Sequence, residues 1–463
     1  MIKNIVNLSL EKLFVILALF FGILYVFILP PFQSVDEGMH FFRTYQISEG
    51  HLSAKKIDGK VGDEIPSSLS NFYDKYVPFI KNIDKKTNLA QMKSNFQLQV
   101  EADRREFTQF TNTALYSPVC YISQLPGIIA GKIAKLSLGG IYYLGRLSNL
   151  IAYCLLVFWA LRITPFFKCP MFLLALMPMS LSLAGAYTCD VAVLGLNFLW
   201  MALILKSMTL SEKLKFTNKW IIMLAILGLL IALSKSYVLL LPLIFLLPPK
   251  LFSSRRDYFI SVFGILAVAF AGLAYWSFCI KGLSLDMNDS FANSAMQIEF
   301  IKTHPFAYIL VLIKTFFVKT PRLLITMIGV LGWQDTKLDW ITYIAYPVLM
   351  YFAVCADNYD FKLAKWQKAL IWVVLVTGIV ITYTSLYIMW SPVGNSVVLG
   401  LNGKYFIPMM LPLCLIFKNF AAKYDYKKVK FAIIIAVILI LASSEMSLLH
   451  RFYNITPQLY YKI

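Results

Sequence analysis

Residues 13–31 read LFVILALFFGILYVFILPP, an uninterrupted apolar run that ends in two prolines. The run holds no charged residue and has the length of about 20 residues that a helix needs to cross a bilayer. Lys12 precedes it, and no small-residue cleavage site follows it. Because a cleaved signal peptide would carry such a site, we predict a retained transmembrane helix that enters from the cytoplasm.

The whole chain has the composition of a polytopic membrane protein. Of its 463 residues, 59% are hydrophobic and 14% are charged, against about 45–50% and about 25% in soluble domains. The net charge of +19 would suit nucleic acid in a soluble protein. Here the basic residues lie mostly between apolar runs, so we expect the lipid bilayer and no nucleic acid as a partner. Seven singly scattered cysteines argue against a disulfide framework or a zinc site.

Apolar runs of near-spanning length recur along the chain and predict an all-α bundle of about eleven spans. The runs are 13–31, 140–161, 170–188, 190–208, 219–234, 236–249, 258–280, 340–356, 368–390, 404–418 and 430–449. The connections between them are alternately basic and nearly uncharged. Because basic connections face the cytoplasm, this alternation predicts a bacterial inner (plasma) membrane protein with a cytoplasmic N-terminus and an extracytoplasmic C-terminal tail.

Two long segments, 32–139 and 281–339, fall on the extracytoplasmic side. They divide the chain into a first transmembrane helix (1–31), a group of helices at 140–280 and a C-terminal group at 340–463. The apolar stretch 113–136 is interrupted by prolines, so that a helix lying on or dipping into the membrane and an extra span both fit.

A second ambiguous stretch lies at 304–333, where Pro321 and Arg322 separate two apolar pieces. Prolines commonly interrupt helices, and we favour a re-entrant hairpin over two additional short helices. Two more spans would raise the count to 13 without changing the sidedness of the other connections.

Two adjacent carboxylates, Asp36 and Glu37, follow the first span in the phrase PPFQSVDEGMHFFR at 30–43. As purely structural residues they would cap and favour the N-terminus of a helix after the prolines. His40 and Arg43 follow at helical spacing, however, which places two acids, an imidazole and a guanidinium near one face. Such a cluster can deprotonate an acceptor hydroxyl while a cation binds a phosphate.

The same phrase resembles the signature PPF-x-x-P-DE-x-x-H-F-x-R of a family of bacterial predicted membrane proteins, with Val35 in place of the usual proline. That family is assigned to the GT-C superfamily of polyprenyl-phosphate-sugar-dependent glycosyltransferases. The phrase NGKYFIP at 402–408 is similar to the family's late QGRYFLP, and weaker matches are Tyr116-Ser117-Pro118, Arg146-Leu147 and Asp190. The resemblance implies a GT-C-type bundle, a catalytic Asp-Glu motif in a large first extracytoplasmic loop, and a second acid after the third helix.

The predicted topology places Asp36, Glu37, Asp190, Lys235 and Lys404 on the extracytoplasmic side. Asp190 suits both a helix N-cap and a catalytic acid. Basic residues at span ends either snorkel to the membrane surface or bind a lipid-linked phosphate. The candidate donor-binding residues are His40, Arg43, Arg146, Lys235, Arg322, Lys404 and Tyr405.

These patterns predict a glycosyltransferase that moves a sugar, such as the hexose glucose, from polyprenyl phosphate to a hydroxyl of an extracytoplasmic glycan such as O antigen, with inversion. Asp36 is the expected base. His51, His304 and His450 have no ligand-spaced partners, so a divalent metal ion would need carboxylates of Asp36, Glu37 and Asp190. The chain has no P-loop and no GxGxxG, which argues against a nucleotide donor. The alternatives are a lipid-linked glycan transporter or flippase, and a polysaccharide ligase or polymerase that uses a diphosphate-linked donor.

Overall fold

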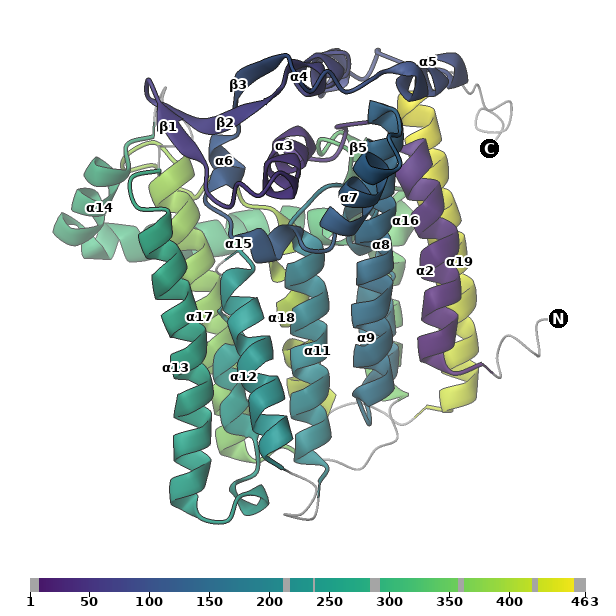
Figure 1. Ribbon diagram of the computed structural model, residues 1–463. Helices are drawn as coiled ribbons and strands as arrows, with labels where there is room; N and C mark the ends of the chain where they lie inside the picture. The colour runs from purple at the N-terminus through teal and green to yellow at the C-terminus, as the bar shows by residue number, and fades with distance from the viewer. Residues whose placement is uncertain are drawn as a thin grey trace.

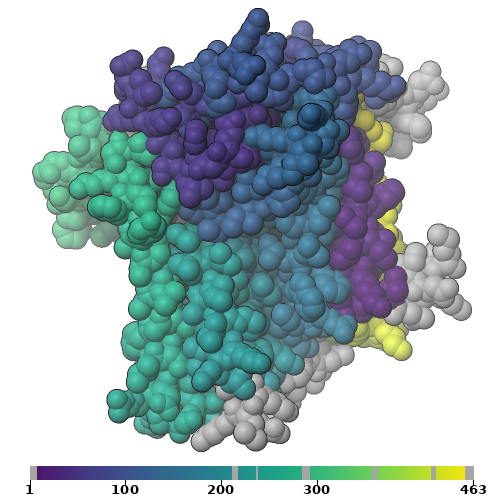
Figure 2. All heavy atoms as spheres, viewed as in Figure 1, coloured from purple at the N-terminus to yellow at the C-terminus, as the bar shows by residue number. Residues whose placement is uncertain are grey.

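The apolar runs form a bundle of long helices, and residues 32–139 form a layer across one end of it (Figure 1). The space-filling view shows this layer, in purple and blue, over the upper end of the bundle (Figure 2). The computed structural model describes residues 8–210, 217–235, 238–283, 292–356, 362–418 and 424–453. A large segment outside the bundle therefore follows directly on the first helix.

Six described helices are long and apolar enough to cross a membrane. They are α2 (Leu10–Ile28), α8 (Leu138–Ile163), α11 (Asp190–Met208), α13 (Arg255–Cys279), α17 (Lys365–Trp390) and α19 (Tyr426–Phe452). Shorter apolar helices are α12 (Asn218–Leu233), α16 (Trp340–Cys355) and α18 (Ile407–Phe417), which follows the 3-10 turn η7 (Gly403–Phe406). Exposed side chains such as Phe263, Phe270 and Val373 suit contact with lipid. The polytopic helical membrane class is confirmed, and the number of crossings stays a prediction.

The predicted span at 170–188 is broken into two short helices, α9 (Lys168–Ala175) and α10 (Pro178–Ala184). A break in a membrane helix is tolerated where other groups satisfy the freed backbone. Here the Tyr153 hydroxyl donates to the carbonyl of Ala175 at 2.8 Å, and the Ser180 hydroxyl donates to that of Leu174 at 2.8 Å. The predicted segment is therefore buried in the bundle, but it forms two short helices instead of one continuous helix.

The predicted span at 236–249 forms no long helix in its described part, and residues 236 and 237 lie outside the described residues. Leu241–Leu246 is a 3-10 helix, η5, and Pro249–Leu251 is another, η6. Prolines at 242, 248 and 249 interrupt the α-helical hydrogen-bond ladder. The stretch is mostly buried, and Trp200 Nε1 donates to the Leu240 carbonyl at 3.0 Å, so that irregular backbone is sheltered from lipid.

The layer over the bundle combines short helices with a three-stranded antiparallel sheet in the order β1-β2-β3. Its strands are β1 (Lys55–Ile57), β2 (Lys60–Pro66) and β3 (Arg105–Gln109). Its helices are α3 (Glu37–Ser48), α4 (Ser67–Asp74), η1 (Val77–Phe79), α5 (Leu89–Ser94), η2 (Asn95–Gln97), α6 (Thr111–Ala114), η3 (Pro118–Tyr121) and α7 (Leu125–Ile133). With 9 residues, α7 is too short to cross a bilayer. The extra-span interpretation of 113–136 is therefore wrong.

The segment after α13 contains α14 (Ser294–Thr303), α15 (Pro305–Gly329) and a small hairpin of β4 (Val330–Leu331) and β5 (Thr336–Lys337). The re-entrant hairpin expected at 304–333 is wrong, because α15 continues through Pro321 as one helix of 25 residues. A proline removes one backbone hydrogen bond and bends a helix, but it does not have to end the helix. Here the apolar side chains continue on both sides of Pro321.

Helix α15 runs across the long helices instead of alongside them (Figure 1). Phe306, Leu310, Ile313 and Phe317 are exposed at helical spacing on it. An apolar stripe of this kind suits a helix that lies in the membrane interface.

The first and last bundle helices run in the same direction. Lys430 Nζ, near the start of α19, donates to the Leu8 carbonyl at 2.7 Å. At the other end, the Tyr453 hydroxyl donates to the Ile28 carbonyl at 3.0 Å. Residues 8 and 453 thus lie at opposite ends of the bundle, as an odd number of crossings requires. Which end faces the cytoplasm stays a prediction, and the predicted C-terminal tail beyond Tyr453 lies outside the described residues.

Candidate functional site

A cavity of about 630 Å³ lies where the layer meets the bundle, and its walls differ in chemistry. One wall is polar and comes from the layer, the turn after α12 and η7. It contains Asp36, His40, Asn112, Tyr116, Lys235, Lys404 and Tyr405. The opposite wall is largely apolar and comes from α17, through Ile381, Leu386, Met389 and Trp390. A cavity of this kind suits an amphipathic ligand with a charged head and a hydrocarbon body.

Asp36 stands at the turn that leads into α3, and its backbone has φ of 61°. The left-handed region is uncommon for residues with a Cβ, although aspartate tolerates it better than most. Its side chain makes no capping hydrogen bond to α3. The carboxyl group lines the cavity instead, so the N-cap interpretation does not account for it.

Burial raises the pKa of the Asp36 carboxyl above its usual range, and the opposing effects of Lys404, Lys235 and a hydrogen bond from Asn112 do not cancel this rise. A carboxylate with a raised pKa binds a proton more readily than an ordinary aspartate. Asp36 therefore has a chemical property that a general base needs.

Asp190, Lys235 and Lys404 form a second polar group in the same region. The Asp190 carboxylate lies 3.2 Å from Lys235 Nζ and 2.8 Å from Lys404 Nζ. Asp190 is the first residue of α11. Its backbone N–H donates to the Thr188 hydroxyl at 3.1 Å, so the Thr188 side chain satisfies a backbone donor at the start of this helix. The Asp190 side chain is thus committed to the lysines rather than to helix capping.

The two lysines and one carboxylate carry one net positive charge, and the charges of Asp36 and Lys81, which also line the cavity, offset each other. Lys235 Nζ also lies 5.1 Å from the ring centre of Tyr405 and 5.6 Å from that of Tyr116. Aromatic faces favour a nearby cation. The excess positive charge, held in place by Asp190 and the rings, can bind a phosphate.

Glu37 points away from the cavity, although it adjoins Asp36 in the sequence. Both of its oxygens accept from Arg146, at 2.8 Å each, and one also accepts from the Tyr187 N–H at 3.0 Å. Arg146 further donates to the carbonyls of Val26, Leu29 and Pro30. Both side chains are fully buried.

This ion pair joins α8 to the end of α2 and the start of α3. A guanidinium has five N–H donors, and those of Arg146 are all used by protein acceptors. Arg146 therefore has no donor left for a phosphate, and we correct its predicted role from ligand binding to structural support.

The other predicted residues occupy three different settings. His40 lines the cavity, and burial, assisted by Lys235, lowers its pKa to about 3, so it acts as a neutral imidazole near pH 7. Its Nδ1 lies 3.1 Å from the Tyr121 hydroxyl. Arg43 is buried outside the cavity, where it donates to the carbonyls of Leu52 and Tyr116. Arg322 lies on α15 and lines a separate hollow.

The hairpin formed by β4 and β5 was not predicted from the sequence. Trp333 and Gln334 from its tip line the cavity, and Trp333 Nε1 donates to the Phe32 carbonyl at 2.9 Å, which ties the hairpin to the turn that holds Asp36. Asn112 was also missed. Gln334, Asp335 and Thr336 directly follow the apolar run of α15, and this change in polarity could have indicated the hairpin.

A divalent metal ion does not fit the residues present. Among the residues that the structure describes, no group of three or more His, Cys, Asp or Glu side chains is placed to hold one. The Asp190 oxygens pair with lysines, and the Glu37 oxygens pair with Arg146.

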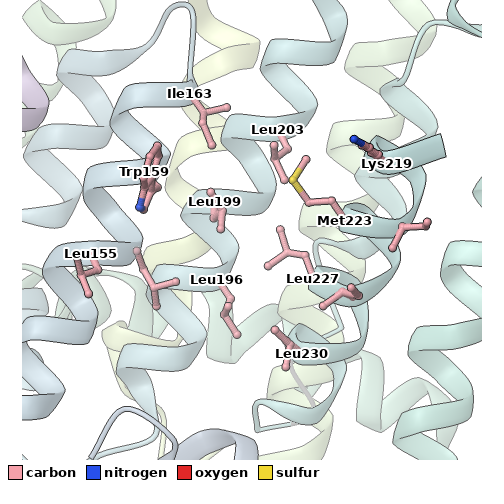
Figure 3. Close-up of a pocket in the computed structure, with 13 residues that line it drawn as sticks. Leu155, Trp159, Ile163, Leu196, Leu199, Leu203, Lys219, Met223, Leu227 and Leu230 are labelled. Carbon is pink, nitrogen blue, oxygen red and sulfur yellow. The ribbon is translucent and has the colours of Figure 1, made fainter. Parts of the chain in front are cut away.

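A second large hollow, of about 550 Å³, lies between α8, α11 and α12. Figure 3 shows side chains such as Trp159, Leu199 and Leu227 facing it, with Lys219 at its edge. Its lining is almost entirely apolar. Lys219 is the one ionisable side chain among the described residues that line it, and no carboxylate accompanies it, so the cavity at Asp36 is the candidate site.

Comparison with known proteins identifies the family. The chain belongs to a family described as predicted membrane protein (DUF2142), whose model matches residues 19–413. No curated protein and no solved structure matches the chain. The family membership supports the membrane setting of the cavity.

Proposed function

We propose that this member of the DUF2142 family is a GT-C-type glycosyltransferase, which transfers a sugar from polyprenyl phosphate to a hydroxyl of an extracytoplasmic glycan. One observation carries the proposal. A carboxyl group with a raised pKa, that of Asp36, shares a cavity with the cations Lys235 and Lys404. A base for the acceptor and a positive charge for the leaving group are what this reaction requires.

The two walls of the cavity support a lipid-linked donor. The charged wall suits a phosphate, and the apolar side chains of α17, which include the exposed Ile381 and Trp390, suit a hydrocarbon chain. A soluble nucleotide sugar has no hydrocarbon chain that could contact these apolar side chains.

In the proposed reaction, Asp36 accepts the proton of the acceptor hydroxyl while the oxygen of that hydroxyl attacks the anomeric carbon of the sugar. The bond between that carbon and the phosphate oxygen breaks, and the configuration inverts. The leaving phosphate gains negative charge, which Lys404 and Lys235 stabilise. Asp190 positions the two lysines. Glu37 positions the turn that carries Asp36, through its ion pair with Arg146. A hexose donor such as glucose, an acceptor such as O antigen, and a site on the periplasmic face of the inner membrane complete the proposal.

The transfer of a labelled sugar from a polyprenyl-phosphate donor to candidate glycans by the purified protein tests the proposal. Asp36→Asn keeps the shape of the side chain but cannot take the proton, so we expect turnover to fall by about 10²–10⁴-fold. Asp58→Asn, in the exposed turn between β1 and β2, is the matched control and should leave turnover unchanged. Normal turnover in Asp36→Asn would remove Asp36 from the role of base.

A lipid-linked glycan transporter is the alternative that one observation favours. The helix pair α9 and α10 is broken inside the bundle, and broken helices form binding sites in many transporters. Transport needs no chemical step. Movement of the labelled donor across a proteoliposome membrane, without any transfer to an acceptor, would support the transporter and contradict the proposed enzyme.

A further inference from the structure

A side hollow of about 210 Å³ adjoins the main cavity. Gln334, Leu399 and Gly400 line both spaces, so the two share a wall. Helix α15 contributes Lys319 and Arg322 to the lining of the hollow. A ligand in the main cavity therefore lies next to two further cations.

Lys319 and Arg322 are one helical turn apart, so they lie on the same face of α15. In the part of the chain that the structure describes, neither side chain forms an ion pair with a carboxylate. Lys314, on the same helix, donates instead to the Ser396 hydroxyl at 3.3 Å and does not line the hollow. Two unpaired cations facing one concave space favour an anionic ligand there.

We propose that Lys319 and Arg322 bind a phosphate or carboxylate group of the molecule that receives the sugar. The assignment to the acceptor rests on the proposed function, which gives the phosphate of the donor to Lys235 and Lys404. The planar guanidinium of Arg322 can form two parallel hydrogen bonds to such a group. The wall shared with the main cavity would place the acceptor hydroxyl near Asp36 while its charged group is held by α15.

An anionic lipid headgroup offers the same chemistry, because α15 lies across the bundle and exposes apolar side chains as interfacial helices do. The two sources differ in one testable respect. A lipid headgroup would fill the side hollow in any anionic bilayer, whereas an acceptor group would leave it open to a soluble anion.

The test is equilibrium binding of radiolabelled inorganic pyrophosphate to the full-length protein in nanodiscs of phosphatidylcholine. We expect Arg322→Gln and Lys319→Gln each to weaken binding by about 10- to 150-fold, since a charge-assisted contact contributes about 1.5–3 kcal/mol. Lys314→Gln is the control on the same helix and should bind as the unchanged protein does. The effect of Arg322→Gln should persist in a Lys404→Met background, which separates the side hollow from the main cavity.

Two results would overturn the proposal. Equal pyrophosphate affinity in the unchanged protein and in both variants would show that the hollow binds no anion. The second is that phosphatidylglycerol in the nanodiscs abolishes pyrophosphate binding to the unchanged protein but does not change the residual binding to Arg322→Gln. That result would assign the hollow to lipid headgroups and remove the acceptor role. Because binding requires no turnover, failure here is distinguishable from failure of the proposed transfer reaction.

Discussion

Replacing Arg146 by methionine should destabilise the protein strongly without touching the cavity. The substitution keeps much of the aliphatic stem and removes a fully buried guanidinium. The Glu37 carboxylate is then left in the interior with N–H donors from Tyr187 and Ser34 only. The carbonyls of Val26, Leu29 and Pro30 also lose their shared donor.

The expected loss is about 3–5 kcal/mol, which is the cost of removing one partner from a buried ion pair. The total stability of a protein is only about 5–15 kcal/mol. Arg104→Met is the control, because Arg104 pairs with Glu101 and their side chains are 79% and 50% exposed. An exposed pair contributes about 0–1 kcal/mol, so Arg104→Met should change stability little.

The measurement is denaturant or thermal unfolding in one detergent, followed by tryptophan fluorescence. The double variant Glu37→Gln/Arg146→Met should be more stable than Arg146→Met alone, because no unpaired charge remains. An unchanged unfolding midpoint in Arg146→Met, together with weaker donor binding, would refute this reasoning and return Arg146 to the list of ligand-binding residues.

Three further predictions concern the topology, the lysines and the buried histidine. Reporter fusions after Lys60 and after Lys428 should report opposite sides of the membrane, and a common side would separate Asp36 from Lys404 and dismantle the site. In single-turnover measurements, Lys404→Met should lower the rate more than donor affinity, Lys404→Arg should retain activity, and Lys235→Met should act mainly on affinity; unchanged kinetics in Lys404→Met would make that lysine an interfacial anchor. The pKa of His40 falls from 6.5 to about 3 on folding, so its contribution to stability is complete above pH 6.5 and is lost as the pH falls towards 3, by at most about 2 kcal/mol at pH 5. His40→Gln should flatten the decline of the unfolding temperature between pH 6.5 and pH 5, and an identical decline in both proteins would contradict the buried, neutral imidazole.

The sequence alone determined the class of the protein, because hydropathy over about 20 residues is a local property that decides whether a helix crosses a bilayer. Nine of the eleven predicted runs correspond to continuous apolar helices, and the other two are broken at prolines and sheltered by buried side chains such as Trp200. The Asp-Glu phrase likewise located the turn where Asp36 faces the cavity. Both inferences rest on neighbouring residues.

Only the tertiary structure decided which of the candidate residues meet. Asp36 and Glu37 are adjacent, yet the left-handed turn at Asp36 sends one carboxyl to the cavity and the other to Arg146. Asp190, Lys235 and Lys404 come from segments far apart in the chain, and no local pattern indicates that the Asp190 carboxylate lies 2.8–3.2 Å from both ammonium groups. Such pairings follow from how the helices pack, which depends on the summed contacts of the whole bundle rather than on any single stretch of sequence.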